Sequence, residues 1–197
     1  MTKRLVLFLA GSGFLIALSF LLDAPVHNLL FAYRPDWLVA VAKCISKFGG
    51  WIGLMMGCGL FLLVAIRRRD EKWRRLLITM MITASLAGLA ADGIRAATGR
   101  ARPNSGVAPG WYGIRNGSRW LIIDSRYNSF PSGHTAAAMG LAAPLLLLRR
   151  RSGWLLLTLA VVIAASRLIL DAHHFSDVIA GALLAFAVSA WWLKKGA

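Results

Sequence analysis

The sequence predicts an all-α membrane protein, a bundle of six transmembrane helices with an interfacial amphipathic helix between the first and second spans. Of the 197 residues, 58% are hydrophobic and 16% are charged, and the mean hydropathy is +0.63. A soluble domain of this length cannot bury so much apolar surface, because the buried fraction grows only slowly with chain length. The apolar residues also form runs of about the length that crosses a bilayer, with basic clusters between them.

Six apolar runs are predicted to be the spanning helices, and the shorter ones must include flanking residues. In chain order they are Leu5–Leu22, Trp51–Ile66, Leu76–Ala91, Thr135–Leu148, Trp154–Leu168 and Val178–Leu193. The first run follows two basic residues, as in a signal peptide, but about 18 residues is long for the apolar part of such a peptide. No small-residue cleavage site follows it, and no internal repeat or linker is evident. Residues 1–197 are therefore expected to form a single integral membrane domain.

The segment between the first two runs has an amphipathic pattern. Trp37, Val41 and Ile45 recur every four residues, and Lys43 and Lys47 lie opposite them. This spacing predicts a helix that lies in the membrane interface.

The positions of the basic residues predict the orientation. The formal net charge is +15, and four cationic clusters mark alternate ends of the six spans: Lys3 and Arg4, residues 67–75, residues 149–151, and Lys194 and Lys195. Because short loops rich in Lys and Arg stay in the cytoplasm, both termini are expected there, with the remaining loops on the extracytoplasmic side. The clusters then act as topology signals, and no nucleic-acid partner is expected.

Two arginines follow the third run on that extracytoplasmic side, Arg95 and Arg102, the second directly before Pro103. If the helix continues past Thr98, the two arginines lie two turns apart on one face, although Gly99 would favour an earlier end. Ionisable groups near hydrocarbon are costly, which points to a function. The alternative is a cationic collar that binds lipid phosphates.

A second polar group opens the fourth run, at Pro131-Ser132-Gly133-His134. Proline is favoured in a first helical turn, where the amides that follow have no acceptor within the helix. These amides can bind an anion, Gly133 lets it approach the backbone, Ser132 adds a hydroxyl donor and His134 can exchange a proton near neutral pH. The alternative is an ordinary turn.

A third polar group lies between the fifth and sixth runs, from Ser166 and Arg167 to His173 and Asp177. A carboxylate four residues after a histidine can fix the imidazole tautomer and leave the other ring nitrogen free as a nucleophile. Ser176 is a plausible cap for the last helix, so a purely structural loop is the alternative.

These three groups together resemble the signature of the type 2 phosphatidic acid phosphatase superfamily: Lys-x6-Arg-Pro, Pro-Ser-Gly-His and Ser-Arg-x5-His-x3-Asp, in that order. The match runs from Arg95 to Asp177, and the six-span layout agrees with it. Arg95 replaces the lysine of the pattern; it keeps the charge but has a planar group in place of a compact ammonium.

The resemblance implies a function for each motif residue. His173 would be the nucleophile, Asp177 its orienting partner and His134 the general acid. The residues expected to hold the phosphate are Arg95, Arg102, Ser132, Gly133 and Arg167. Because fixed cations and helix-end amides can stabilise the transferring phosphoryl group, and no carboxylate cluster is visible, neither a metal nor another cofactor is expected.

The resemblance implies a bacterial inner membrane, and the positions of the basic residues place the site at its extracytoplasmic surface. The predicted substrate is therefore a lipid phosphomonoester or diphosphate. Phosphatidylglycerol phosphate, phosphatidic acid, undecaprenyl diphosphate and lipid A all present such a headgroup. Trp111, Trp120 and Arg115 of the loop at residues 104–130 suit an interface. The alternatives are a lipid phosphotransferase with the same phosphohistidine intermediate and a non-catalytic protein that binds anionic lipid; the related vanadate haloperoxidases are soluble.

Overall fold

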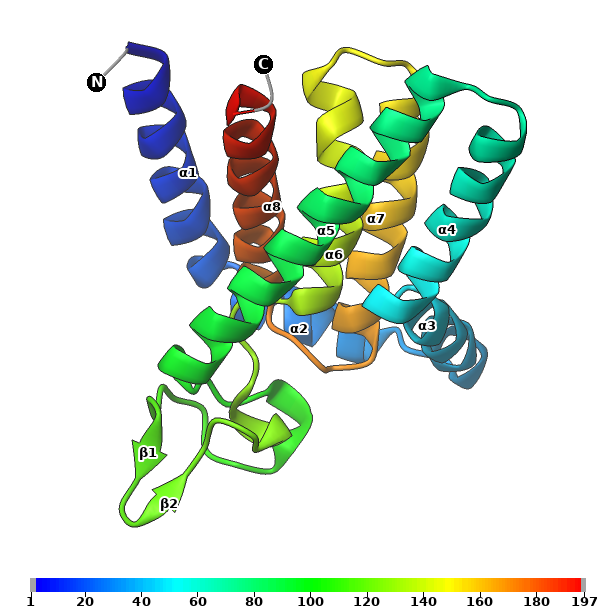
Figure 1. Ribbon diagram of the computed structural model, residues 1–197. Helices are drawn as coiled ribbons and strands as arrows, with labels where there is room; N and C mark the ends of the chain where they lie inside the picture. The colour runs from blue at the N-terminus through cyan, green and yellow to red at the C-terminus, as the bar shows by residue number, and fades with distance from the viewer. Residues whose placement is uncertain (1–2, 196–197) are drawn as a thin grey trace.

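The computed structural model describes residues 3–195, with side chains from Ala10 onward, and is mostly helical (Figure 1). Within that range the α-helices are α1 (Lys3–Leu21), α2 (Asp23–Ala32), α3 (Asp36–Phe48), α4 (Trp51–Arg67), α5 (Glu71–Thr98), α6 (Gly133–Leu147), α7 (Ser152–Ile169) and α8 (Phe175–Lys195). The segment between α5 and α6 holds the 3-10 turns η1 (Pro103–Ser105) and η2 (Ser125–Tyr127). It also holds the antiparallel strands β1 (Arg115–Asn116) and β2 (Arg119–Trp120), paired in the register Arg115 to Trp120.

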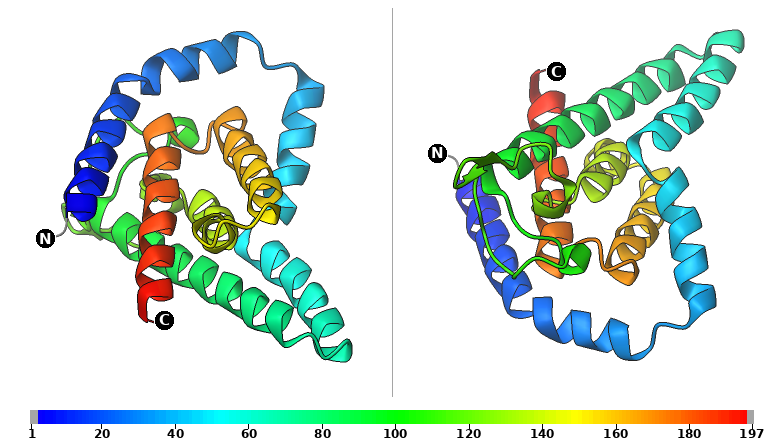
Figure 2. Two further views of the ribbon diagram at one scale, coloured as in Figure 1. Left: turned by 90° about the horizontal axis from the view of Figure 1, so that it is seen from above. Right: turned by 90° about the horizontal axis from the view of Figure 1, so that it is seen from below.

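Helix α6 lies at the centre and packs against α4, α5, α7 and α8. The chain from α1 to α5 runs around the outside of α6, α7 and α8 (Figure 2). Every residue of α6 from Thr135 to Leu145 is buried. Small side chains allow this: a Cβ on Gly140 would lie 2.6 Å from Ala84 Cα, so α5 and α6 touch through their backbones. Thr83 Oγ1 adds a hydrogen bond to Gly140 O at 2.7 Å.

The helices include several that can cross a bilayer. In the part of the chain that the structure describes, α5, α7 and α8 are each long and apolar enough, and two bent pairs satisfy the same criterion jointly. The pairs are Ala10–Leu21 with α2, bent by 49°, and α3 with α4, bent by 61°; α6 is apolar but shorter. The predicted helical fold is therefore confirmed, with helices long and apolar enough to span a membrane, whereas six separate spans and an interfacial helix stay predictions.

Three local features differ from the sequence prediction. Helix α2 lies outside every run predicted to be helical; Pro25 is in its first turn, where a proline is tolerated. Helix α5 is longer than Leu76–Ala91, since the Asp70 carboxylate accepts from Trp73 N at 3.0 Å and caps an earlier start. Strands β1 and β2 add a small hairpin to the predicted all-α fold.

The opposite end of α5 is fixed by Gly99. Its φ of +57° is left-handed and ends the helix at Thr98, and a Cβ there would lie 2.0 Å from Gly113 O. Continuation of the helix to Arg102 is therefore wrong: Arg95 lies on the helix and Arg102 on the loop that follows.

Candidate active site

The three sequence motifs meet at one end of the bundle, where α5 ends, α6 begins and α7 connects to α8 (Figure 1). Arg95 lies in the last turn of α5, Ser132 is the residue before α6, and Arg167 lies in the last turn of α7. His173 is in the connection to α8, and Asp177 is in the first turn of α8. Backbone contacts join these segments, since Ser132 N donates to Asp177 O at 2.9 Å.

The imidazole of His173 is almost completely buried and its orientation is defined. Nδ1 lies 2.8 Å from Ser129 O and 3.5 Å from Asp177 Oδ2. A carbonyl oxygen can only accept, so the proton must be on Nδ1 in the neutral ring. Nε2 is buried without a hydrogen-bond partner among the described residues, which leaves its lone pair unused.

Burial lowers the pKa of His173 to about 4, against the effect of the nearby Asp177 carboxylate, which raises it. The positive charges of Arg102 and Arg167 lower this pKa further. His173 is therefore neutral at physiological pH, which is the state that a nitrogen nucleophile requires.

The Asp177 carboxylate is fully buried and holds the connection before α8 in place. Oδ2 accepts from Ser129 Oγ at 2.6 Å and from His174 N at 2.7 Å, and Oδ1 accepts from Arg100 Nη1 at 2.5 Å. The sequence suggested that Asp177 orients His173 directly. In the structure Ser129 makes the shorter contact with the ring, and Asp177 binds Ser129.

The start of α6 brings an arginine and a histidine together. A Cβ on Gly133 would lie 3.0 Å from Arg95 Nη2, so this glycine lets the guanidinium approach the helix end. The Ser132 hydroxyl accepts from Thr135 Oγ1 at 3.0 Å and can still donate its own proton. On the other side, a Cβ on Gly50 would lie 3.4 Å from His134 Nε2.

Three arginines, Arg95, Arg102 and Arg167, lie around the start of α6. Arg95 pairs with Asp92 one turn earlier on α5. The guanidinium of Arg102 donates to Asn128 O at 3.2 and 3.3 Å, and burial lowers its pKa, an effect that Asp177 opposes. Arg167 donates to Ser46 Oγ, its Nε has no partner among the described residues, and the charges of Arg102 and Arg95 repel its own. Such a concentration of like charge favours a bound anion.

Sequence reasoning missed several of these contacts. Ser129, Arg100 and Ser46 received no role, and Asp23 has no visible partner in the sequence, although its carboxylate binds Arg100 Nη2 at 2.7 Å. The signal that could have revealed the contact of Asp23 is its position beside an apolar run, because a charged residue there requires a partner. Ser176 is not the helix cap: it lies inside α8, and its N–H donates to Asp23 Oδ1 at 2.7 Å.

The loop at residues 104–130 extends from the site to the hairpin. Trp111 packs edge-on against Phe130 at 5.2 Å, next to the Pro131 motif. Trp120 and Arg115 lie farther out and are exposed. A hydrogen bond from Arg126 lowers the pKa of Asp124 to about 2, so the carboxylate stays charged and anchors η2.

No group of three or more His, Cys, Asp or Glu side chains is arranged to hold a metal ion within the described residues. Arg102 and Arg167 place positive charge near His173. That composition suits an anion. Metal independence itself stays a prediction.

Comparisons with known proteins place the chain in a family. No curated protein matches its sequence. Among solved structures, LpxE of Aquifex aeolicus is similar with a TM-score of 0.62 and 21% identity, over 88% of this chain and 95% of that one. A transmembrane PAP2-type phosphatidylglycerolphosphate phosphatase from Bacillus subtilis is similar with a TM-score of 0.58 and 20% identity, over 96% of each chain. These likenesses show the fold. The model of the PAP2 superfamily matches residues 5–196, and the chain belongs to that superfamily.

Proposed function

We propose that this protein is a membrane lipid phosphatase that hydrolyses a phosphomonoester or diphosphate headgroup through a phosphohistidine on His173. One observation carries the proposal most directly. The Nδ1 proton of His173 is fixed by Ser129 O, and its Nε2 has no partner among the residues that the structure describes; the charges of Arg102 and Arg167 lie nearby. An electron pair on a neutral nitrogen next to an anion-binding cluster is the arrangement that attack on phosphorus requires.

The proposed reaction has two steps that balance in protons. First, His173 Nε2 forms a bond to phosphorus while the bond to the lipid oxygen breaks, and His134 donates a proton to that oxygen. Next, a water molecule attacks the phosphohistidine, His134 takes a proton from that water, and the phosphorus–nitrogen bond breaks. Phosphate leaves and both histidines return to their starting states.

Charge stabilisation would come from the residues around the phosphate. Arg95, Arg102 and Arg167 supply cations, and Ser132 with the first amides of α6 supplies hydrogen-bond donors. The equatorial oxygens of the transferring group gain negative charge, which these donors would stabilise without a metal.

The placement of charge supports the membrane topology that we propose, with six spans, α3 at the interface and both termini in the cytoplasm. The loops from α4 to α5 and from α6 to α7, and the end of α8, lie together at the end of the bundle opposite the site (Figure 1). They carry Arg67–Arg69, Arg149–Arg151 and Lys194–Lys195. By the positive-inside rule the site would face the extracytoplasmic side of a bacterial inner membrane.

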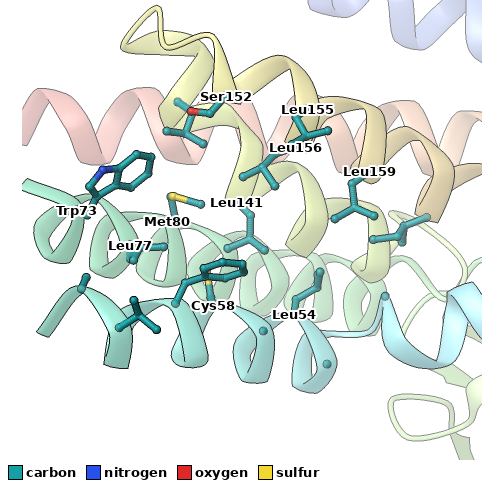
Figure 3. A pocket seen from close by; sticks show the side chains of 18 of the residues that line it. Leu54, Cys58, Trp73, Leu77, Met80, Leu141, Ser152, Leu155, Leu156 and Leu159 are labelled. Carbon is teal, nitrogen blue, oxygen red and sulfur yellow. The ribbon is translucent and has the colours of Figure 1, made fainter. Parts of the chain in front are cut away.

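An apolar cavity supports a substrate with a hydrocarbon chain. It has a volume of about 800 Å³ and lies between α4, α5, α6 and α7, with Leu77 and Leu141 in its wall (Figure 3). Gly49 and Ile163 line it as well, and Ile163 is one helical turn before Arg167. A lipid bound by its phosphate at the arginines could therefore place a chain in this cavity.

The decisive experiment measures phosphate release in detergent from phosphatidylglycerol phosphate, phosphatidic acid, undecaprenyl diphosphate and lipid A. We expect release from at least one of them and inhibition by vanadate, which mimics the transferring phosphoryl group. Transfer of the phosphate to a lipid acceptor would instead indicate a phosphotransferase. Binding of these lipids without any turnover would overturn the enzymatic proposal.

The proposed topology has its own test, in a variant without Cys44 and Cys58. A single cysteine placed in the loop at residues 104–130 should react with an impermeant maleimide in intact spheroplasts. A cysteine in the connection from α4 to α5, residues 68–70, should react only after the membrane is opened. The reverse pattern would place the site on the cytoplasmic side, and reaction of both from outside would exclude six spans.

A further inference from the structure

Arg100 lies just after α5 and connects the buried carboxylate of Asp177 with the partly buried carboxylate of Asp23. Its Nη1 donates to Asp177 Oδ1 at 2.5 Å and to Ser176 Oγ at 2.7 Å, and its Nη2 donates to Asp23 Oδ2 at 2.7 Å. Only 8% of Arg100 is exposed. Arg100 occupies an unspecified position of the pattern that begins at Arg95, and Asp23 lies outside all three patterns, so the family motifs assign neither residue a role.

The guanidinium is held in a fixed plane. The ring centroids of Phe20 and Trp111 lie 5.1 and 5.0 Å from Arg100 Cζ, within the range of cation–π contacts. Asp23, the first residue of α2, also accepts from Ser176 N and from Ser176 Oγ, both at 2.7 Å. The start of α2, the loop after α5 and the first turn of α8 therefore meet at this one arginine.

We propose that Arg100, held by Asp23, is a positioning residue that keeps Asp177 anionic and in place, and that it controls through Asp177 and Ser129 which tautomer His173 adopts. This inference rests on the proposed function, because it concerns the nucleophile of that reaction. We assign no contact with substrate to Arg100 or to Asp23.

The contacts form a continuous path to the nucleophile. Asp177 binds Arg100 with Oδ1 and the Ser129 hydroxyl with Oδ2, and Ser129 O accepts the Nδ1 proton of His173. A fully buried carboxylate is stable as an anion only when it is paired. Without Arg100, Asp177 would take up a proton or shift. The Ser129 hydroxyl would then lose the carboxylate that accepts its proton. The Ser129 carbonyl would no longer be held in place as the partner of His173 Nδ1.

A merely structural role makes a different prediction. The same contacts could only fasten α2 to α8, and a variant would then lose stability without a specific effect on chemistry. The two cases are separated by a double-mutant cycle, because residues that act along one path have non-additive effects. Arg74, which pairs with Glu71 at 2.5 Å at the other end of the bundle, provides a matched arginine–carboxylate control.

The test compares Arg100→Gln, Arg100→Lys, Asp23→Asn, Asp177→Asn and the Arg100→Gln, Asp177→Asn double variant, each checked for a folded monodisperse state. We expect Arg100→Gln to lower kcat by roughly 10- to 100-fold, with KM changed less than about threefold. In the Asp177→Asn background the same change should cost less than about threefold. Arg100→Lys should recover part of kcat, and Arg74→Gln should match the parent.

Two kinetic outcomes would overturn the inference: full additivity in the double variant, or a loss expressed in KM with kcat unchanged. A readout independent of turnover is the ¹⁵N spectrum of the His173 imidazole at neutral pH. We expect the Nδ1–H tautomer in the parent and a mixture with Nε2–H in Arg100→Gln. An unchanged tautomer contradicts the role of Arg100 even if the enzyme is active, whereas a parent without phosphatase activity contradicts the proposed function alone.

Discussion

His173 and His134 are brought to one site by different parts of the fold, and their surroundings differ. His173 is almost fully buried, and a backbone carbonyl determines which ring nitrogen carries its proton. His134 is only half-buried, in the first turn of α6, and its Nε2 faces the backbone of Gly50 on a neighbouring segment. A nucleophile must keep one tautomer, whereas a group that donates and then accepts a proton must exchange it with its surroundings. The two environments match those separate tasks.

The largest effect is expected from His173→Ala. No other described side chain has an unpaired buried ring nitrogen, so the variant should lose more than about 10⁴-fold in kcat. Rapid-quench labelling with a phosphate-labelled lipid should trap a phosphoenzyme in the parent and none in the variant. Equal labelling of both would assign the nucleophile to another residue.

The next largest loss of kcat is expected from His134→Gln, and its size should depend on the leaving group. With the lipid substrate, kcat should fall by about 10²- to 10⁴-fold, the usual contribution of general acid–base catalysis. A phosphate ester with a good leaving group needs no acid for the first step, but its phosphoenzyme still needs a base for hydrolysis. The variant should therefore accumulate phosphoenzyme with that ester. If His173→Ala accumulates it as well, the distinction between the two histidines is wrong.

The titration of His173 sharpens the same contrast. Its pKa of about 4 lies below the ordinary 6.5, because burial disfavours the imidazolium. The unfolded chain then binds more protons than the folded chain between these values. The contribution of His173 to stability is complete above pH 6.5 and is lost as pH falls toward 4. A ¹⁵N titration should give a midpoint near 4 in the parent and a lower one in Asp177→Asn, which lacks the carboxylate that favours the charged ring. A midpoint near 6.5 would show that the ring is exposed.

A smaller effect is expected from filling the space beside His134. Gly50→Leu places a side chain against the imidazole and should lower kcat by roughly tenfold, because small displacements of catalytic groups are costly. Gly59→Leu, on the helix that Gly50 precedes, is the control, since nothing lies within 4 Å of the added Cβ. Equal rates for the two variants would show that His134 has room to move.

The smallest expected effect is that of a chelator. The described residues offer arginines where a metal enzyme would offer carboxylates. Excess EDTA should leave phosphate release unchanged within about a factor of two. A loss of activity that magnesium restores would mean that a metal supplies charge that we assign to the arginines.

Local patterns predicted the three motifs and every described α-helix except α2, because hydrophobic runs and short spacings are visible within a few residues. The supports of the site depend on contacts far apart in the chain: Ser176 and Asp23 are 153 positions apart, and Arg100 and Asp177 are 77 apart. No periodicity relates such residues. Ser129 is close to the Pro131 motif in the sequence. Its role depends on the Asp177 carboxylate and the His173 imidazole, which lie 48 and 44 positions later in the chain.

The close packing of α6 limits which substitutions this protein can accept. This helix begins the site with Ser132 and His134 and is then buried along its length among backbones that nearly touch, as at Gly140 and Ala84. In a saturation library, larger side chains on α6 should be depleted because they would displace packing groups and the residues to which we assign catalysis. Substitutions should be tolerated more often on α4 and in the loop at residues 104–130, where positions such as Phe61 and Trp120 are exposed.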